Sequence, residues 1–179
     1  MEATAHILCD LGYEELSTNR VALRAGVSIG SLYQYFPSKE ALVGELMDRH
    51  CDRMNALFGE AFLRGAHLSP RELTRLVIGA IYEAKAESPK LSRVLREKLP
   101  HLGRTSRLEE NLEQVAHAVA GYLEQRKELL RVACPIRAAF YVVELGESLT
   151  MSTVLKRPDA DPETAIDEIT DIVMRYLFV

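Results

Sequence analysis

Apolar residues recur along most of this chain at the three- and four-residue intervals expected of helices that bury one face. Leu73, Val77, Ala80 and Ala84 follow this spacing in the middle of the chain. The sequence contains no Asn-Gly or Asp-Gly hairpin pair and no long alternating stretch, so the pattern predicts an all-α protein. We expect helices over residues 2–11, 18–25, 29–36, 38–64, 70–87, 89–99, 104–127, 135–156 and 162–178.

Several of these helices begin at a capping residue followed by proline. The fullest case is Ser69-Pro70-Arg71-Glu72, in which serine caps the helix, proline occupies the first turn and glutamate completes a capping box. Shorter versions occur at Ser88-Pro89, Cys134-Pro135 and Asp161-Pro162. These signals predict where four of the later helices start.

Two short helices joined by a glycine corner are predicted between residues 18 and 36. Gly26 supplies the left-handed backbone conformation at the corner, which other residues adopt at a cost. Ser28 is placed to cap the second helix, and Leu32 is placed to anchor it to the core. This arrangement is typical of a helix-turn-helix that reads DNA.

The second of these helices is expected to expose small, polar and aromatic residues: Ile29, Gly30, Ser31, Tyr33, Gln34 and Tyr35. In a major groove, Gln34 would pair with an adenine edge and Ile29 would contact a thymine methyl. Lys39 lies in the first turn of the next helix, where free backbone amides also favour a phosphate. Alternatively, the tyrosines are half-buried packing residues. That alternative accounts for each short segment, but it does not account for the whole ordered string.

Composition is compatible with a folded protein and limits its location. Its 179 residues suffice for one domain or for a small head and a larger body, and 47% of them are hydrophobic. No apolar run approaches the roughly 18 residues of a membrane span, so we expect a cytoplasmic protein without a membrane partner. Cys9, Cys51 and Cys134 lie far apart and are expected to be free thiols, with no metal site and no cofactor.

Charge does not by itself indicate nucleic-acid binding. The formal net charge is −4, and residues 1–47 contain three basic residues against six acidic ones. A DNA-binding domain normally carries a basic surface. This balance favours an alternative in which the head has lost its affinity for DNA.

The string from Ala25-Gly26-Val27-Ser28 to Tyr35-Phe36-Pro37-Ser38-Lys39-Glu40 resembles the signature of the tetracycline repressor (TetR) family of transcriptional regulators. The resemblance covers about residues 5–47 and includes Leu11-Gly12-Tyr13 upstream. A lactose-repressor type of helix-turn-helix shares the turn. Its reading helix usually continues with Val-Ser-Arg, however, and its much larger α/β domain cannot fit here.

The resemblance implies an all-helical homodimer. Residues 1–47 would form a three-helix DNA-binding head, and residues 48–179 a six-helix body for ligand binding and dimerisation. By position, the phosphate contacts would be Thr18, Ser31, Tyr33, Tyr35 and Lys39. The residues nearest base edges would be Asn19, Ser28, Ile29, Gly30 and Gln34.

One departure concerns the start of the chain. Members of this family usually carry a Lys/Arg-rich arm before the first helix, whereas this sequence has no Lys or Arg before Arg20. We expect either that the natural protein begins upstream or that it binds DNA with less electrostatic help.

The body contains candidates for a ligand pocket and for a dimer interface. Five residues place polar groups on largely apolar helices and would orient a mostly apolar ligand if they converge: Tyr82, His101, His117, Tyr122 and Tyr141. Apolar and aromatic residues of the last two helices predict a twofold interface: Phe140, Val143, Leu149, Ile166, Ile169, Val173 and Tyr176. The alternative is that these last residues only close the core of one chain.

The leading hypothesis is a homodimeric repressor that binds a palindromic double-stranded operator and is released by a small molecule. An enzyme is not expected, because no His-x-x-x-His or Glu-x-x-His pair, serine elbow or phosphate loop is present. A third hypothesis is a small-molecule-binding or adaptor protein with a degenerate DNA-binding head.

Overall fold

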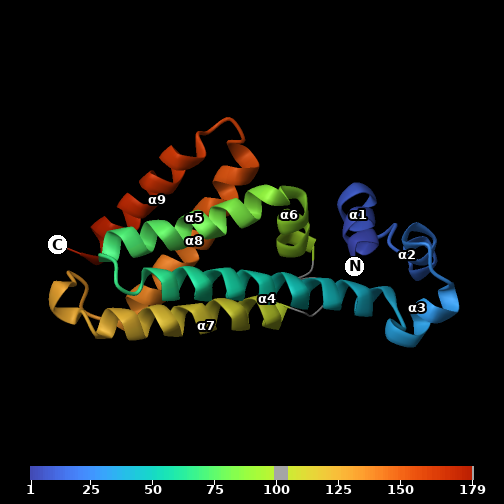
Figure 1. Cartoon of the computed structure of the whole chain (residues 1–179), viewed down its shortest axis with the longest axis horizontal. Helices are drawn as coiled ribbons and strands as arrows, with labels where there is room; N and C mark the ends of the chain where they lie inside the picture. Colours follow the sequence, from blue (N-terminus) through green and yellow to red (C-terminus); the bar gives the residue numbers. More distant parts are fainter. Residues whose placement is uncertain (99–104, 179) are drawn as a thin grey trace. The chain divides into compact units, whose positions relative to one another are not determined.

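The computed structural model describes residues 1–98 and 105–178. Over these residues the regular structure is helical, as the sequence predicts (Figure 1). The helices are α1 (Glu2–Leu11), α2 (Thr18–Ala25), α3 (Ile29–Tyr35), α4 (Lys39–Gly65), α5 (Pro70–Glu87), α6 (Pro89–Lys98), α7 (Thr105–Glu124), the 3₁₀ helix η2 (Lys127–Leu129), α8 (Pro135–Lys156) and α9 (Pro162–Leu177). The all-α prediction is therefore confirmed. Helix α7 ends earlier than expected and is followed by η2.

The chain divides into two compact units. The head unit comprises Met1–Asp52 and Lys90–Leu108, and the body unit comprises Arg53–Pro89 and Glu109–Val179. The sequence had placed the boundary after residue 47 and all later residues in the body. Helix α6 belongs with the head because Leu95 is buried in the head core and Leu91 packs against it.

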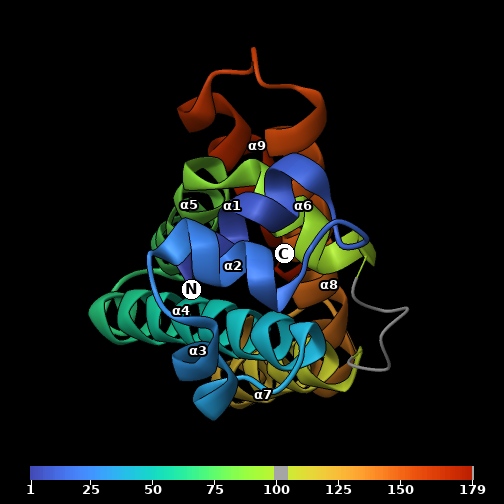
Figure 2. The same ribbon diagram turned by 90° about the vertical axis from the view of Figure 1, so that its right-hand side faces the viewer.

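The head core is built from the apolar faces of short helices. Ile7 and Leu8 of α1, Val21 of α2 and Leu42 of α4 are buried together. Helix α2 lies against both α1 and α3 (Figure 2). This packing holds α3 at the edge of the head, where most of its side chains lie outside the core.

The body core lies among α5, α8 and α9. Ile78 of α5, Ala139 of α8 and Ile166 of α9 are buried in one apolar cluster. Helix α5 packs against α8 and α9, which also contact each other (Figure 1). Within the described ranges, no helix has the length and apolar character needed to cross a membrane.

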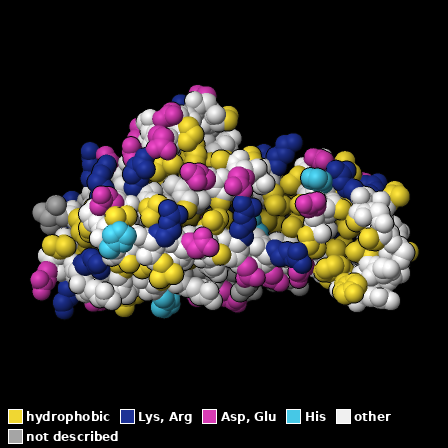
Figure 3. Space-filling view, in the orientation of Figure 1, with side chains coloured by type: hydrophobic (Ala, Val, Ile, Leu, Met, Phe, Trp, Pro, Cys, Tyr) yellow, Lys and Arg dark blue, Asp and Glu magenta, His cyan; other side chains and the backbone are white. Residues whose placement is uncertain are grey.

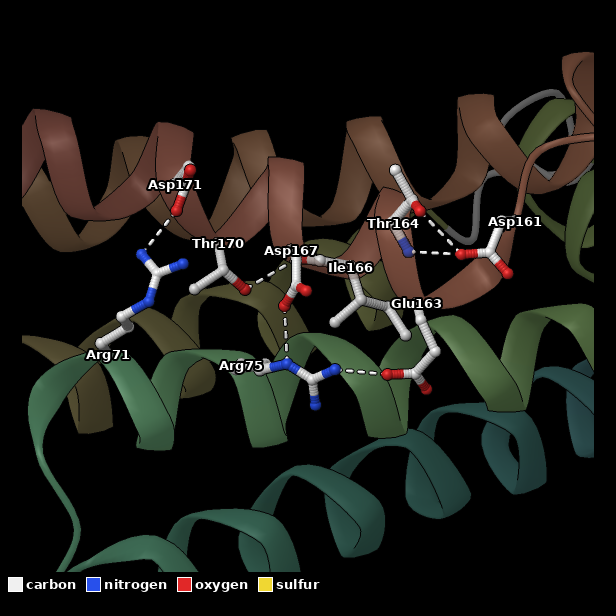
Figure 4. A network of polar contacts seen from close by, with 9 residues as sticks. All are labelled: Arg71, Arg75, Asp161, Glu163, Thr164, Ile166, Asp167, Thr170 and Asp171. Atoms are coloured by element: carbon white, nitrogen blue, oxygen red, sulfur yellow. Dashed lines mark hydrogen bonds and ion pairs between the residues drawn. The ribbon is translucent and has the colours of Figure 1, made fainter.

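A ladder of ion pairs runs along the outer side of α5 and α9 (Figure 4). Arg71 pairs with Asp171, and Arg75 pairs with both Glu163 and Asp167. The arginines are four residues apart on α5 and the acids are four apart on α9, so each set lies on one helix face. Because these side chains are well exposed, the ladder aligns the two helices but adds little stability for each pair.

One charged group lies inside the body unit. The Lys85 side chain is 2% exposed, and its Nζ donates to Thr150 Oγ1 at 2.8 Å and to the Glu147 carbonyl at 3.0 Å. It also pairs with the Glu147 carboxylate. These contacts join α5 to α8 and provide the hydrogen bonds that a buried ammonium requires.

Candidate nucleic-acid interface

The helix-turn-helix is formed by local hydrogen bonds at both helix starts and at the corner. Ser17 caps α2 by accepting from the Arg20 amide at 3.3 Å, and Ser28 caps α3 by accepting from the Ser31 amide at 3.0 Å. Gly26 adopts the left-handed conformation, with φ 69° and ψ 27°. The Val27 amide then donates to the Ala22 carbonyl at 3.0 Å, which closes the end of α2. The predicted Ser28 cap and the glycine corner are confirmed.

The predicted reading surface of α3 faces solvent. Tyr35 is 76% exposed, Tyr33 50% and Ile29 38%. The other predicted residues that are exposed are Asn19, Ser28, Gly30, Ser31 and Gln34. An exposed run of this kind is what contact with a DNA groove requires; the individual DNA contacts stay predictions.

Thr18 differs from the other predicted contact residues because it is buried. Its Oγ1 donates a hydrogen bond of 3.1 Å to the phenolic oxygen of Tyr33. Thr18 is the first residue of α2, and its side chain turns toward α3 rather than outward. The structure therefore gives it a supporting position behind Tyr33, whereas the sequence had placed it among the phosphate contacts.

Sequence reasoning missed the contacts that Tyr13 makes with the first two residues of α4. The Lys39 Nζ lies 4.3 Å from the centroid of the Tyr13 ring and donates to the Tyr13 carbonyl at 3.4 Å. The Tyr13 hydroxyl donates to Glu40 Oε1 at 2.9 Å. Burial and this bond to a carboxylate raise the pKa of Tyr13 to about 12. The Leu11-Gly12-Tyr13 motif was visible in the sequence, but it contains no sign of contact with Lys39.

The two arginines before α3 already have partners within the head. Arg20 pairs with the Glu15 carboxylate and also donates to the Glu15 carbonyl at 3.0 Å. Arg24 Nη2 lies 3.2 Å from His6 Nδ1. Helix α3 itself carries no charged residue, and the face drawn in Figure 3 shows hydrophobic and uncharged atoms at this end of the head. The reading surface is therefore neutral rather than basic.

The predicted ligand-pocket residues do not converge as a group. Tyr82 is buried in the body core, and Tyr122 packs against the same core cluster. His117 is exposed instead, because five residues along α7 separate it from Tyr122 and turn it to another helix face. Tyr141 is also exposed, so the prediction is wrong for His117 and Tyr141. His101 lies outside the described residues.

Tyr122 has an unusual environment within the body unit. Its ring meets the Phe62 ring edge-on at 5.6 Å, and the Arg126 guanidinium lies 3.9 Å from its centroid. In the described part of the chain, its buried hydroxyl and the buried Asn111 Oδ1 lack hydrogen-bond partners. Burial raises the pKa of Tyr122, and the charge of Arg126 acts in the opposite direction.

The predicted dimer residues divide between the core and the surface. Ile166, Ile169 and Val173 are 3–5% exposed and belong to the core of their own chain, so the structure corrects their assignment to an interface. They occupy the stripe of α9 that faces α5 and α8. Leu149 packs against this core, and Val143 is partly buried.

A different set of apolar residues on α8 and α9 remains exposed. Phe140 and Tyr176 of the predicted set are 50% and 38% exposed. Tyr141 links them, with ring centroids 5.8 Å from Phe140 and 6.4 Å from Tyr176. With Ile136 and Ile172, which are also exposed, they form what we name the α8–α9 patch.

Sequence comparison finds matches in both parts of the chain. A family model described as bacterial regulatory proteins, tetR family, matches residues 1–46, and one described as tetracyclin repressor-like, C-terminal domain, matches residues 69–177. The HTH-type transcriptional repressor KstR of Mycolicibacterium smegmatis is 33% identical over 95 residues, which is 53% of this chain and 46% of that protein. KstR of Mycobacterium tuberculosis is 32% identical over 95 residues, or 53% and 42%. The chain thus matches less than half the length of these curated relatives.

Solved structures share the fold at low sequence identity. The fatty acid degradation regulator FadR from Bacillus halodurans has a TM-score of 0.77 at 18% identity, covering 96% of this chain and 90% of that one. The ketosteroid regulator KstR2 of Mycobacterium tuberculosis has a TM-score of 0.72 at 20% identity, covering 99% and 92%. FadR of Thermus thermophilus in complex with lauroyl-CoA has a TM-score of 0.63 at 18% identity, covering 99% and 93%. With a helix-turn-helix and both family models matched, this chain belongs to the TetR family of bacterial transcriptional regulators.

Proposed function

We propose that this protein is a homodimeric transcriptional repressor that binds a palindromic DNA operator and releases it when a small molecule binds the body. The observation that carries the proposal is the exposed, uncharged surface of α3 behind a glycine corner. Tyr33 and Tyr35 supply hydroxyl donors for phosphates, and Gln34 supplies an amide that pairs with an adenine edge. The protein would act in the cytoplasm, where its DNA is.

The α8–α9 patch supports the homodimer in this proposal. Its aromatic residues are exposed in one chain, and a second copy would cover them by a twofold contact. We expect Tyr176→Glu to convert the dimer to a folded monomer in light scattering, because the new carboxylate would be desolvated in the interface. Leu63→Glu is the matched control, since Leu63 is 78% exposed on α4. A Tyr176→Glu protein that stays dimeric would exclude this interface.

We further propose an elongated, mostly apolar effector, such as a fatty-acyl or steroid skeleton carried on coenzyme A. The names of the structural neighbours motivate this class, since one regulates fatty acid degradation, one is a ketosteroid regulator and one holds lauroyl-CoA. The Phe62–Tyr122 ring pair and the buried Tyr122 hydroxyl suit such a ligand, because an unpaired buried hydroxyl is costly until a partner arrives. Lauroyl-CoA should raise the melting temperature while free coenzyme A should not, and equal shifts would exclude recognition of the acyl chain.

An adaptor or ligand-binding protein without DNA affinity is the second candidate. The observation in its favour is the acidic balance of residues 1–47, with Arg20 already paired to Glu15. Fluorescence anisotropy with labelled duplex DNA at low salt separates the two candidates. The repressor binds with an affinity that falls as salt rises, whereas the adaptor does not bind.

A further inference from the structure

We infer that Tyr13 is a positioning residue for DNA binding. Its ring and carbonyl present the Lys39 ammonium to a phosphate, while its hydroxyl binds the Glu40 carboxylate and keeps it from competing for that ammonium. This inference rests on the proposed function, because it assumes that the first turn of α4 meets the DNA backbone. Tyr13 lies in the segment between α1 and α2, yet it contacts the first two residues of α4. All three residues belong to the head unit.

The first half of the arrangement concerns the ammonium group. Lys39 Nζ lies over the Tyr13 ring at 4.3 Å from its centroid and donates to the Tyr13 carbonyl at 3.4 Å. Both partners are neutral, so they restrict the flexible lysine side chain without neutralising its charge. Ser38 caps α4 by accepting from the Ala41 amide at 3.2 Å. The cation is thereby held at a helix start, where the helix dipole also favours an anion.

The second half concerns the neighbouring carboxylate. Glu40 is the next residue after Lys39, and its Oε1 accepts from the Tyr13 hydroxyl at 2.9 Å. Hydrogen bonds from its own amide, from Ser38 and from Tyr13 lower the pKa of Glu40, so this group stays negative at neutral pH. A mobile carboxylate here would compete with phosphate for Lys39 and repel the DNA backbone. The Tyr13 hydroxyl gives that carboxylate a fixed partner on the protein.

The shortage of basic residues in residues 1–47, which contain the helix-turn-helix, makes this arrangement important. Residues 1–47 contain only Arg20, Arg24 and Lys39 as basic residues. Arg20 pairs with Glu15, and Arg24 contacts His6. Among these three residues, Lys39 is the one whose described contacts, a ring face and a carbonyl, leave its charge available to a phosphate.

Three variants test the inference with the full chain and a fluorescein-labelled random-sequence duplex at low salt, because phosphate contacts do not depend on sequence. Tyr13→Phe keeps the ring under Lys39 but removes one of the hydrogen bonds that hold Glu40, and it should weaken binding about threefold to tenfold. Adding Glu40→Gln removes the negative charge and should restore binding to within about twofold of wild type. Adding Glu14→Gln instead is the matched control, since Glu14 is exposed beside Tyr13; it should leave the defect in place.

The rescue distinguishes positioning from a loss of fold, because a structural defect at Tyr13 would not be repaired by neutralising Glu40. Glu40→Gln alone leaves Tyr13 intact and should bind at least as tightly as wild type. The inference is overturned if Tyr13→Phe binds like wild type, if Glu40→Gln fails to rescue it, or if Glu14→Gln rescues it equally. If the wild-type chain binds no duplex at low salt, the proposed function fails, and the inference fails with it.

Discussion

Thr18 Oγ1 donates a hydrogen bond of 3.1 Å to the phenolic oxygen of Tyr33, which joins the first turn of α2 to the exposed face of α3. The phenol accepts this bond and keeps its own hydrogen for an outside acceptor. A buried threonine thus orients an exposed tyrosine on the predicted reading surface. The two residues thus lie in different environments, one buried and one exposed, although the resemblance had assigned both to phosphates.

Removing this hydrogen bond should weaken DNA binding and also lower stability. Thr18→Val keeps the shape of the side chain but loses the donor, so Tyr33 becomes freer to rotate. We expect binding to fall about threefold to tenfold, with a loss of about 1 kcal/mol in the free energy of unfolding. Thr18→Ser keeps the hydroxyl and is the control. Adding Thr18→Val to Tyr33→Phe should cause little further loss of binding, and fully additive losses would show that the residues act independently.

Two glycines of the helix-turn-helix should respond in opposite ways to alanine. Gly26 has φ 69°, so Gly26→Ala strains the backbone and should lower the free energy of unfolding by about 1 kcal/mol. Gly30 lies within α3, where an added Cβ meets only Ser28 Oγ at 3.9 Å, so Gly30→Ala should leave the fold as stable or more stable. Chemical denaturation measures both changes.

The same Gly30→Ala protein should lose affinity for DNA by about tenfold or more if Gly30 lies against a base edge. Stability and binding would then change in opposite directions in one variant. Unchanged binding would remove Gly30 from the interface without affecting the account of Gly26.

The buried Lys85 should contribute to stability only as one member of a pair. Lys85→Met leaves the Glu147 carboxylate without this cation inside the body unit, and we expect a loss of about 3 kcal/mol in the free energy of unfolding. Lys85→Met combined with Glu147→Leu replaces the pair by apolar side chains and should recover much of that loss. Urea denaturation measures each protein. A double variant as unstable as the single one would mean that Lys85 acts through contacts other than the Glu147 carboxylate, such as Thr150.

Sequence periodicity predicted helix positions far better than it predicted which helix faces meet. The capping box at Ser69 and the corner at Gly26 involve neighbouring residues, so local sequence determines them. The apolar stripe of α9 was also evident, but a stripe does not say whether it packs inside one chain or against another. Ile166 and Ile169 were therefore predicted to lie in a dimer interface, whereas they are buried in the core of their own chain.

Contacts between residues far apart in the sequence could not be predicted from local sequence patterns, for the same physical reason. Tyr13 and Lys39 are separated by two helices, and their contact depends on how those helices pack. Tyr122 and Tyr141 both place a polar group on an apolar helix, yet the first packs against the core and the second is exposed. Helix α6 shows the effect on a larger scale, because its residues follow α5 in sequence but join the head unit.

The hydrogen bond from Tyr13 to Glu40 should give stability a dependence on alkaline pH. Burial first and this bond second raise the pKa of Tyr13 from 10.0 to about 12 in the folded protein. The neutral phenol is thus favoured by folding, so its contribution is fully present below pH 10 and is lost as the pH rises toward 12. The stability difference between wild type and Tyr13→Phe should shrink over this range in denaturation series. A difference that stays constant would contradict the bond.

Selection of duplexes from a random pool by the full chain at low salt tests the central claim most directly, namely that paired α3 surfaces read DNA. The account predicts enrichment of an inverted repeat whose half-sites lie about 10 base pairs apart, one helical turn, as a twofold dimer requires. The Gln34→Ala protein should bind the selected duplex less tightly while keeping its fold and its dimer. A pool with no enriched sequence, or equal binding by Gln34→Ala, would contradict the account.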